Sequence, residues 1–263
     1  MTTDQLQSVT TRNGVTLRYL DTGAGDPPML FIHGWTCNLT TFRDQVPFFA
    51  KEHRVVAFDQ RGHGESDKPD QDYTIEGFVN DVAWLIDELK IEKPIVVGHS
   101  MGGSITLNLV RKYPDIATAA ILIDAPIIPL PETAQSLIAP LFVGLQSPAY
   151  AGVAEGFGRM SFFNTKSPPA LVEELVAVIK SAPQRLMYTA MMSILDEKSM
   201  PAGPLPVPAL FIRAEEPQLA TEDGLRERYP GMSVITVPAA HFVQMEQPAA
   251  TNNIIKDFLD KLE

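Results

Sequence analysis

Short runs of apolar residues recur along the chain and predict the strands of a buried sheet. The runs are continuous rather than alternating, which is typical of strands covered on both faces. They occupy residues 29–32, 55–58, 95–97, 119–123, 210–212 and 234–237. Ahead of them, residues 15–21 follow an Asn13-Gly14 turn signal, so we expect them to form the second arm of a hairpin.

Between several of these runs the apolar positions follow the 3.6-residue period of a helix. The positions are Phe78, Val82, Leu85, Ile86 and Leu89 and, ahead of the helix stop at Pro114, Ile105, Leu109 and Val110. A further helix is expected around residues 254–259. Alternation of strands and helices is typical of an α/β protein with a mostly parallel central sheet.

The alternation stops between residues 127 and 205, where no convincing strand is found. Helical patches near 134–145, 170–180 and 184–195 predict a helical insertion, and the Pro-rich segment 201–208 predicts the return to the sheet. The expected domains are therefore a core, residues 1–126 and 206–263, and an insertion, residues 127–205. Its Met and Phe side chains are expected mainly to form its own core, with some facing an acyl or aromatic substrate. They are Phe142, Phe157, Met160, Phe162, Phe163, Met187, Met191 and Met192.

Composition narrows the classes of partner. The chain has 263 residues, 45% of them hydrophobic, which suffices for one large core. Its formal charge of -11 opposes the phosphate backbone that a nucleic-acid-binding protein must neutralise, so we expect a small-molecule substrate. Cys37 is the single cysteine, which excludes an internal disulfide.

Signals for export and for membrane insertion are missing from the sequence. Residues 1–7 are polar and lack the basic start and apolar run of a secretory signal, and no stretch approaches the ~20 apolar residues of a membrane-spanning helix. We therefore expect a cytoplasmic protein without membrane contact. No His, Cys and Asp cluster has the spacing of a metal site, so no metal and no cofactor are expected.

The strongest chemical signal is a Gly-x-Ser-x-Gly pattern at residues 98–102, placed between an apolar strand and a helix. Such a turn holds Ser100 clear of the sheet in a strained conformation, and glycines on both sides avoid collisions with neighbouring backbone. The free NH of Met101 at the helix start can donate to a developing oxyanion. Ser100 is therefore the candidate nucleophile.

A serine nucleophile needs a base, and His241 is the best placed of the five histidines. It follows the last apolar run, in a loop at the carboxyl end of a strand, where parallel sheets assemble their sites. Structural roles are expected for the other four, His33, His53, His63 and His99.

Four blocks in this order resemble the α/β-hydrolase superfamily, close to its esterase, non-haem haloperoxidase and carbon-carbon hydrolase branches. The blocks are residues 33–35, 58–66 and 98–103, and His241 followed by Glu246 and Pro248. The resemblance covers nearly the whole chain outside the insertion. It implies an α/β-hydrolase fold in which the insertion is a lid over the active site.

The resemblance also implies roles for three residues near the first two blocks. The backbone NH of Trp35 would be the second oxyanion donor. Asp59 and Arg61 would shape a loop below the nucleophile, where we expect them to form a structural salt bridge rather than to take part in catalysis.

The acid of the catalytic triad is less clearly indicated. Members of the superfamily usually carry it after the penultimate strand in a Gly-x-x-Asp context, but here Ala214 and Pro217 occupy those two positions. Glu215 or Glu216 could replace it if the register shifts. Asp124, at the end of the strand after the nucleophile helix, needs no such shift and is favoured.

Together these residues predict a serine hydrolase that cleaves an ester or similar carbonyl through an acyl-enzyme on Ser100. The substrate is expected to have an apolar acyl or aromatic part. Alternatives are a lyase of the hydroxynitrile-lyase kind or a carbon-carbon bond hydrolase, both using the same triad. A non-enzymatic ligand receptor is a more remote alternative, because a fold does not fix a function. The natural substrate and the oligomeric state are not indicated by the sequence.

Overall fold

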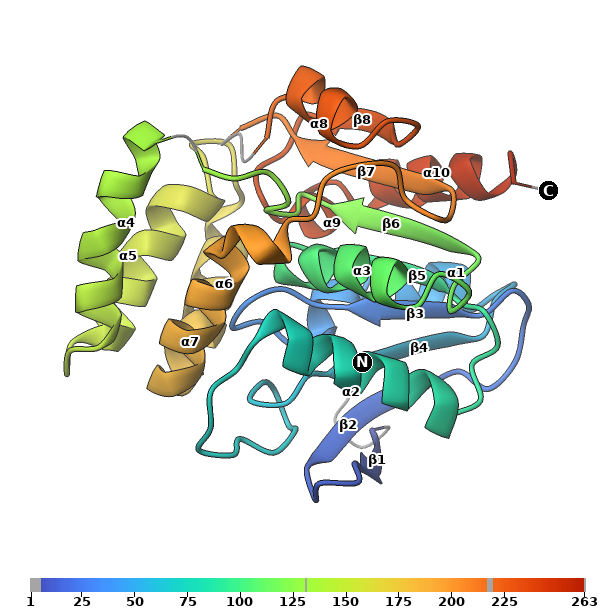
Figure 1. Cartoon of the computed structure of the whole chain (residues 1–263), viewed down its shortest axis with the longest axis horizontal. Coiled ribbons are helices and arrows are strands. Elements are labelled where there is room, and N and C mark those ends of the chain that lie inside the picture. The colour runs from blue at the N-terminus through green and yellow to red at the C-terminus, as the bar shows by residue number, and fades with distance from the viewer. Residues whose placement is uncertain (1–5, 131, 217–219, 263) are drawn as a thin grey trace.

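The apolar runs form one mixed sheet at the centre of the molecule (Figure 1). The structure is a computed structural model that describes residues 6–130, 132–216 and 220–262. Within this part of the chain the sheet has eight strands in the order β1-β2-β4-β3-β5-β6-β7-β8. The strands are β1 (Gln7–Thr10), β2 (Thr16–Asp21), β3 (Met29–Ile32), β4 (Val55–Asp59), β5 (Ile95–His99), β6 (Ala119–Ile123), β7 (Ala209–Ala214) and β8 (Ser233–Val237).

The predicted strands are confirmed, including the hairpin arm, which pairs antiparallel with β1. The strands from β4 to β8 all pair in parallel, and β2 joins them antiparallel through β4. Continuous apolar runs suit this arrangement because both faces are buried. Leu30 and Ile32 pack into one core cluster, whereas Met29 and Phe31 pack into the other. The expected α/β-hydrolase architecture, a mostly parallel sheet between helices, is therefore observed.

Helices cover both faces of this sheet and one end of it (Figure 1). They are α1 (Val46–Phe49), α2 (Ile75–Glu88), α3 (Met101–Lys112), α4 (Glu132–Leu145), α5 (Tyr150–Phe162), α6 (Pro169–Ser181), α7 (Gln184–Leu195), α8 (Glu222–Arg228), α9 (Val243–Glu246) and α10 (Pro248–Leu259), with short 3-10 helices η2 (Leu39–Phe42) and η3 (Glu197–Ser199). Within the described residues, none of the helices is both long and apolar enough to cross a membrane.

The order of the strands brings the candidate residues to one edge. The chain forms β4 on one side of β3 and then continues with β5 on the other side, so the switch point lies at β3 and β5. Ligands of open α/β sheets bind at the carboxyl ends of the strands near such a point. The loops after β3, β5, β6 and β8 carry Trp35, Ser100, Asp124 and His241 respectively.

Helices α4 to α7, which we call the cap, connect β6 to β7 and stand at the end of the sheet toward which the arrows of β6 and β7 point (Figure 1). Three of these helices are predicted from the sequence, but α5 is not. Gly152, Gly156 and Gly158 lie within it, and glycine lowers helix propensity by about 1 kcal/mol relative to alanine. Packing of Ala154 and Phe162 into the core compensates for this weakness.

The Met and Phe side chains of the cap divide between interior and surface. Phe162, Phe163, Met187 and Met191 are buried, as expected for a core of the insertion. Met160 and Met192 are exposed, to 80% and 47%. The expectation that these side chains mainly form the insertion's own core therefore holds for part of the set only, and the buried ones pack in one cluster with residues of the sheet and of α3.

Candidate active site

Ser100 occupies the sharp turn between β5 and α3 that the sequence predicts. Its backbone has φ 54° and ψ −121°, a left-handed conformation that costs a non-glycine residue of order 1–3 kcal/mol. The turn is held because the Ser100 NH donates to the carbonyl of Ile123 at 2.9 Å, on the neighbouring strand. The side chain lies nearly buried at 8% exposure.

The two glycines of the motif are required by close approaches of backbone. A Cβ atom on Gly98 would collide with the carbonyl of Gly102, and a Cβ atom on Gly102 would collide with the carbonyl of Ile32. The steric reason inferred from the sequence is therefore present in the structure.

Asp124 and His241 form a buried pair beside this turn. His241 Nδ1 lies 2.7 Å from Asp124 Oδ2, and both side chains are at most 2% exposed. The other carboxylate oxygen, Oδ1, accepts a hydrogen bond from the Ala214 NH at 3.0 Å. A carboxylate at Nδ1 fixes the proton there and leaves Nε2 as the basic nitrogen.

The backbone of Asp124 explains how a residue at the end of β6 reaches the histidine. Its φ is 42°, and its NH donates to the carbonyl of Ile212 on β7 at 2.8 Å. The strained turn directs the side chain across the edge of the sheet toward the loop after β8.

The rival carboxylates do not pair with the histidine. Glu215 and Glu216 are exposed, and in the described part of the chain neither side chain makes a hydrogen bond or ion pair to His241. Their backbone continues the edge of the sheet, because the Glu215 NH donates to the Val237 carbonyl at 3.0 Å. Pro217 lies outside the described residues.

His99 links the nucleophile turn to the histidine loop. Its Nε2 donates to the main-chain carbonyl of His241 at 2.9 Å, and the two rings lie 4.8 Å apart. Because Ser100 directly follows His99, this hydrogen bond holds the turn of the candidate nucleophile against the loop of the candidate base. No hydrogen bond joins Ser100 to His241 within the described residues, and catalytic hydrogen bonds are often long before substrate binds.

Two backbone NH groups are available near Ser100. Met101 is the first residue of α3, so its NH has no partner within the helix. The segment that leads to Trp35 passes beside the nucleophile, because a Cβ atom on Gly34 would lie 3.0 Å from Ser100 Cβ. In residues 6–130, the Trp35 NH makes no hydrogen bond to another backbone group. Both predicted oxyanion donors are thus next to the nucleophile.

The other histidines around the site are neutral structural residues. Burial lowers the pKa of His33 and of His99 well below the ordinary value, and it lowers the pKa of His63 to about 4. His33 accepts a hydrogen bond from the Gln60 NH at 3.1 Å, and His63 accepts one from the Thr36 NH at 3.2 Å. Each ring thus holds the main chain of a neighbouring loop, which agrees with the structural roles expected for these histidines.

The expected salt bridge between Asp59 and Arg61 is wrong. Arg61 forms a bidentate ion pair with Asp81 of α2 instead. Asp59 accepts hydrogen bonds from the backbone NH groups of Leu39 and Glu65, each at 2.8 Å, and burial raises its pKa to about 6. Its carboxylate is directed at loop NH groups, so the guanidinium pairs with the carboxylate on the helix.

Aromatic side chains of the cap and of the loop after β3 form a wall beside the histidine. The ring of Phe162, at the end of α5, stacks on the His241 imidazole with centroids 4.7 Å apart and an angle of 22°. Trp35 contacts Phe162 and Phe157 edge to face, and its Nε1 donates to the Met187 carbonyl of α7 at 3.1 Å. The sequence places Phe162 only in a set of apolar cap residues, because no spacing signal connects it with His241.

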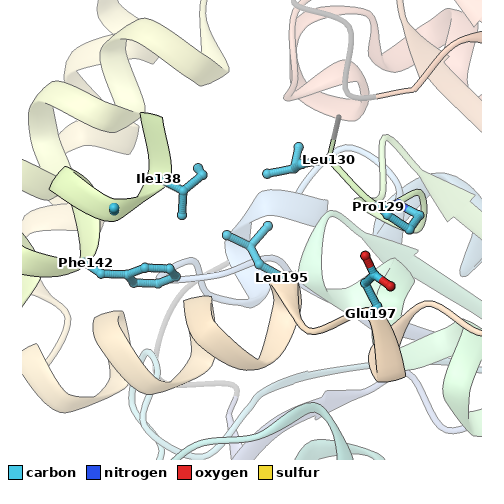
Figure 2. A pocket seen from close by; sticks show the side chains of 7 residues that line it. Pro129, Leu130, Ile138, Phe142, Leu195 and Glu197 are labelled. Carbon is cyan, nitrogen blue, oxygen red and sulfur yellow. The ribbon is translucent and has the colours of Figure 1, made fainter. Parts of the chain in front are cut away.

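A separate apolar pocket lies between α4, the end of α7 and the loop after β6, with a volume of about 270 Å³ (Figure 2). Figure 2 shows the side chains of Leu130, Ile138 and Leu195 turned toward one another, with the Glu197 carboxylate at one side. None of the candidate catalytic residues lines it, so it is not the reaction site itself. Among the described residues, no group of three or more His, Cys, Asp or Glu side chains could hold a metal ion.

Comparison with known proteins gives a consistent picture. The family model for the alpha/beta hydrolase fold matches residues 27–162. A 2-(acetamidomethylene)succinate hydrolase from Mesorhizobium japonicum is 29% identical over 257 residues, covering 94% of this chain and 92% of that protein. A bifunctional esterase/perhydrolase from Acinetobacter calcoaceticus is 39% identical over 120 residues, 44% of each chain.

Solved structures agree on the fold. An esterase from Thermogutta terrifontis superposes with a TM-score of 0.83 at 25% identity, over 98% of this chain and 99% of that one. An enol-lactonase from Burkholderia xenovorans has a TM-score of 0.82 at 23% identity, over 97% of this chain and 100% of that one.

Proposed function

The chain belongs to the α/β-hydrolase superfamily, and on this premise we propose that it is a serine hydrolase that cleaves a carboxylic ester or similar carbonyl through an acyl-enzyme on Ser100. The observation that carries the proposal is the buried contact between His241 Nδ1 and Asp124 Oδ2, next to a serine in a strained strand-to-helix turn. In this proposal Ser100, His241 and Asp124 take the roles of nucleophile, base and orienting carboxylate that acyl transfer needs.

The reaction proceeds in two halves. Ser100 Oγ attacks the carbonyl carbon while His241 Nε2 takes the hydroxyl proton, and the negative charge develops on the carbonyl oxygen. The NH groups of Trp35 and Met101 donate to that oxygen. His241 then protonates the leaving alcohol, and water activated by the same imidazole releases the acid and restores Ser100.

We also propose that residues 127–205 act as a lid that decides which acyl group enters. The support is an aromatic wall in which Phe162 stacks on the imidazole and Trp35 and Phe157 pack against Phe162. Two arginines of the cap are engaged at the surface, since Arg159 pairs with Glu173 and Arg185 pairs with residues 70 and 72. An uncharged small molecule with an apolar or aromatic acyl part suits this wall better than an anionic one.

Turnover of short aryl esters with trapping of the intermediate tests the proposal. The expected result is hydrolysis of p-nitrophenyl esters, and mass spectrometry after an acid quench should find the acyl group on the peptide containing Ser100. A lyase or a receptor would give no acylated peptide. Turnover without any acyl-Ser100, or trapping at another residue, would contradict the proposal.

A further inference from the structure

The loop that carries His241 is held by its main chain as well as by its imidazole. The Ala240 NH donates to Glu246 Oε2 at 2.8 Å, and the His241 NH donates to the carbonyl of Phe162 at 3.2 Å. The His241 carbonyl accepts from His99 at 2.9 Å. The contact with Phe162 comes directly from the cap, and Glu246 provides a second, indirect connection between the cap and the His241 loop.

The second carboxylate oxygen of Glu246 reaches the cap. Oε1 accepts a hydrogen bond from the hydroxyl of Ser167 at 2.7 Å. Ser167 is buried in the connection between α5 and α6, and its hydroxyl oxygen also accepts from the Asn164 NH at 3.2 Å. Glu246 therefore bridges the cap connection, residues 163–168, and the loop of the candidate base.

A carboxylate suits this bridge because it offers two acceptor oxygens. The Ala240 NH can only donate, whereas the Ser167 hydroxyl can donate or accept. A glutamine could therefore keep both contacts, with its oxygen facing the Ala240 NH and its NH2 group facing the Ser167 oxygen. Alanine at position 246 removes both contacts.

We propose that Glu246 is a positioning residue that links the position of the cap connection to the position of His241. The inference rests on the proposed function, because it assigns Glu246 a part in aligning the base with Ser100. Phe162 strengthens the coupling, because its ring stacks on the His241 imidazole and its carbonyl accepts a hydrogen bond from the His241 NH. Movement of the cap connection would then move the base.

The effect of losing the bridge should fall on the chemical step. A misplacement of about 1 Å at a catalytic group can cost ~100-fold in rate. Loss of one of several contacts to the loop is expected to cost at least about tenfold in kcat, while KM changes by less than about twofold because Glu246 does not line the acyl wall.

The experiment compares Glu246→Ala, Ser167→Ala and the double variant with two matched controls. Glu174→Ala removes a carboxylate that also ties the cap to the core, through Arg43. Ser181→Ala removes an exposed cap hydroxyl that donates only to the Val178 carbonyl. For each protein, kcat and KM for an aryl ester, the rate of labelling of Ser100 by a fluorophosphonate, and the melting temperature are measured.

The expected result is a parallel fall of kcat and labelling rate, about tenfold or more for Glu246→Ala and several-fold for Ser167→Ala, with both controls unchanged. The double variant should be no slower than Glu246→Ala, because Ser167 acts through Glu246. The proposal is overturned if kcat and labelling stay at the wild-type value, if the two losses multiply, or if only the melting temperature falls. Ser167→Ala decides the question if Glu246→Ala does not fold. Wild-type protein that is not labelled at Ser100 would instead contradict the proposed function, on which this inference rests.

Discussion

The carboxyl edge of the sheet and the cap hold their residues in different ways. At the edge, Ser100 and Asp124 both have left-handed backbone conformations, and each NH is bonded to the next strand. In the cap, Val143 and Met160 expose large apolar side chains, and the arginines form surface ion pairs. A rigid edge suits groups that must be placed accurately, whereas a helical cap can vary the shape of a wall without moving them.

The two regions meet at His241. Its imidazole is held by Asp124 of the edge and covered by Phe162 of the cap. The comparison therefore predicts that changes at the edge abolish turnover for every substrate, whereas changes in the cap alter the preference among substrates.

The largest effect is expected for Ser100→Ala, which should lower turnover by ~10⁶-fold for all esters, because the covalent step is lost. The melting temperature should stay close to wild type, since the NH that donates to the Ile123 carbonyl remains. Ser104→Ala, in the first turn of α3, is the control and should remain active. Retention of more than a few per cent of activity in a clean Ser100→Ala preparation would contradict covalent catalysis at this residue.

Asp124→Asn should lose at least about a hundredfold in kcat, because an amide facing His241 Nδ1 favours the wrong tautomer and removes the charge that stabilises the imidazolium. Glu215→Gln and Glu216→Gln should each lose less than about tenfold, because both side chains are exposed. Steady-state kinetics on one ester compare the three. A crippled Glu216→Gln or Glu215→Gln with a fully active Asp124→Asn would place the acid after β7.

A change in the cap should act on selectivity. Phe162→Ala removes the ring that stacks on His241 and contacts Trp35, so kcat/KM should fall about tenfold further for aromatic acyl esters than for acetyl esters. Met160→Ala is the matched control, because this side chain lies two residues earlier in α5 and is 80% exposed. Equal losses for both classes of ester would show that Phe162 serves the base and not the acyl group.

The sequence predicts the edge better than the cap for a physical reason. Strands buried on both faces leave continuous apolar runs, and the Ser100 turn requires glycines at fixed positions beside the serine. Both signals therefore lie within short stretches of the sequence. Helix α5 leaves no such signal, because its three glycines weaken the helical pattern and packing restores it. Asp124 is favoured from its place at a strand end, but its distance from His241 depends on the order of β6, β7 and β8.

Contacts between distant parts of the chain are the ones the sequence misses. The pairing of Arg61 with Asp81, on a helix 20 positions away, displaces the expected partner Asp59. The bridge from Ser167 through Glu246 spans 79 positions. Glu246 belongs to a recognisable block with His241, but the block gives no sign of what the carboxylate binds.

The last and smallest effect concerns stability, and it distinguishes the edge from the cap because every histidine lies outside residues 127–205. The pKa of His63 falls from 6.5 to about 4 by burial, and the pKa values of His33 and His99 are also lowered. Between these two pH values the histidines bind protons in the unfolded chain but not in the folded chain. The stability present above pH 6.5 is therefore lost as the pH falls toward 4. Asp59 and Asp81 act in the opposite sense, since burial raises the pKa of both carboxyl groups and this favours the fold in acid, but they are two groups against three.

Urea unfolding at pH 7 and pH 5 measures this loss. His63→Gln keeps an acceptor for the Thr36 NH but removes one titrating group, so its stability should fall by about 2 kcal/mol less than that of wild type between the two pH values. His53→Gln, whose histidine lies in a half-buried turn away from the site, is the control and should show the full wild-type loss. The same loss in His63→Gln and wild type would mean that His63 takes up its proton in the folded state. The acid sensitivity of the edge would then have to come from other groups, with His33 and His99 the next to be replaced.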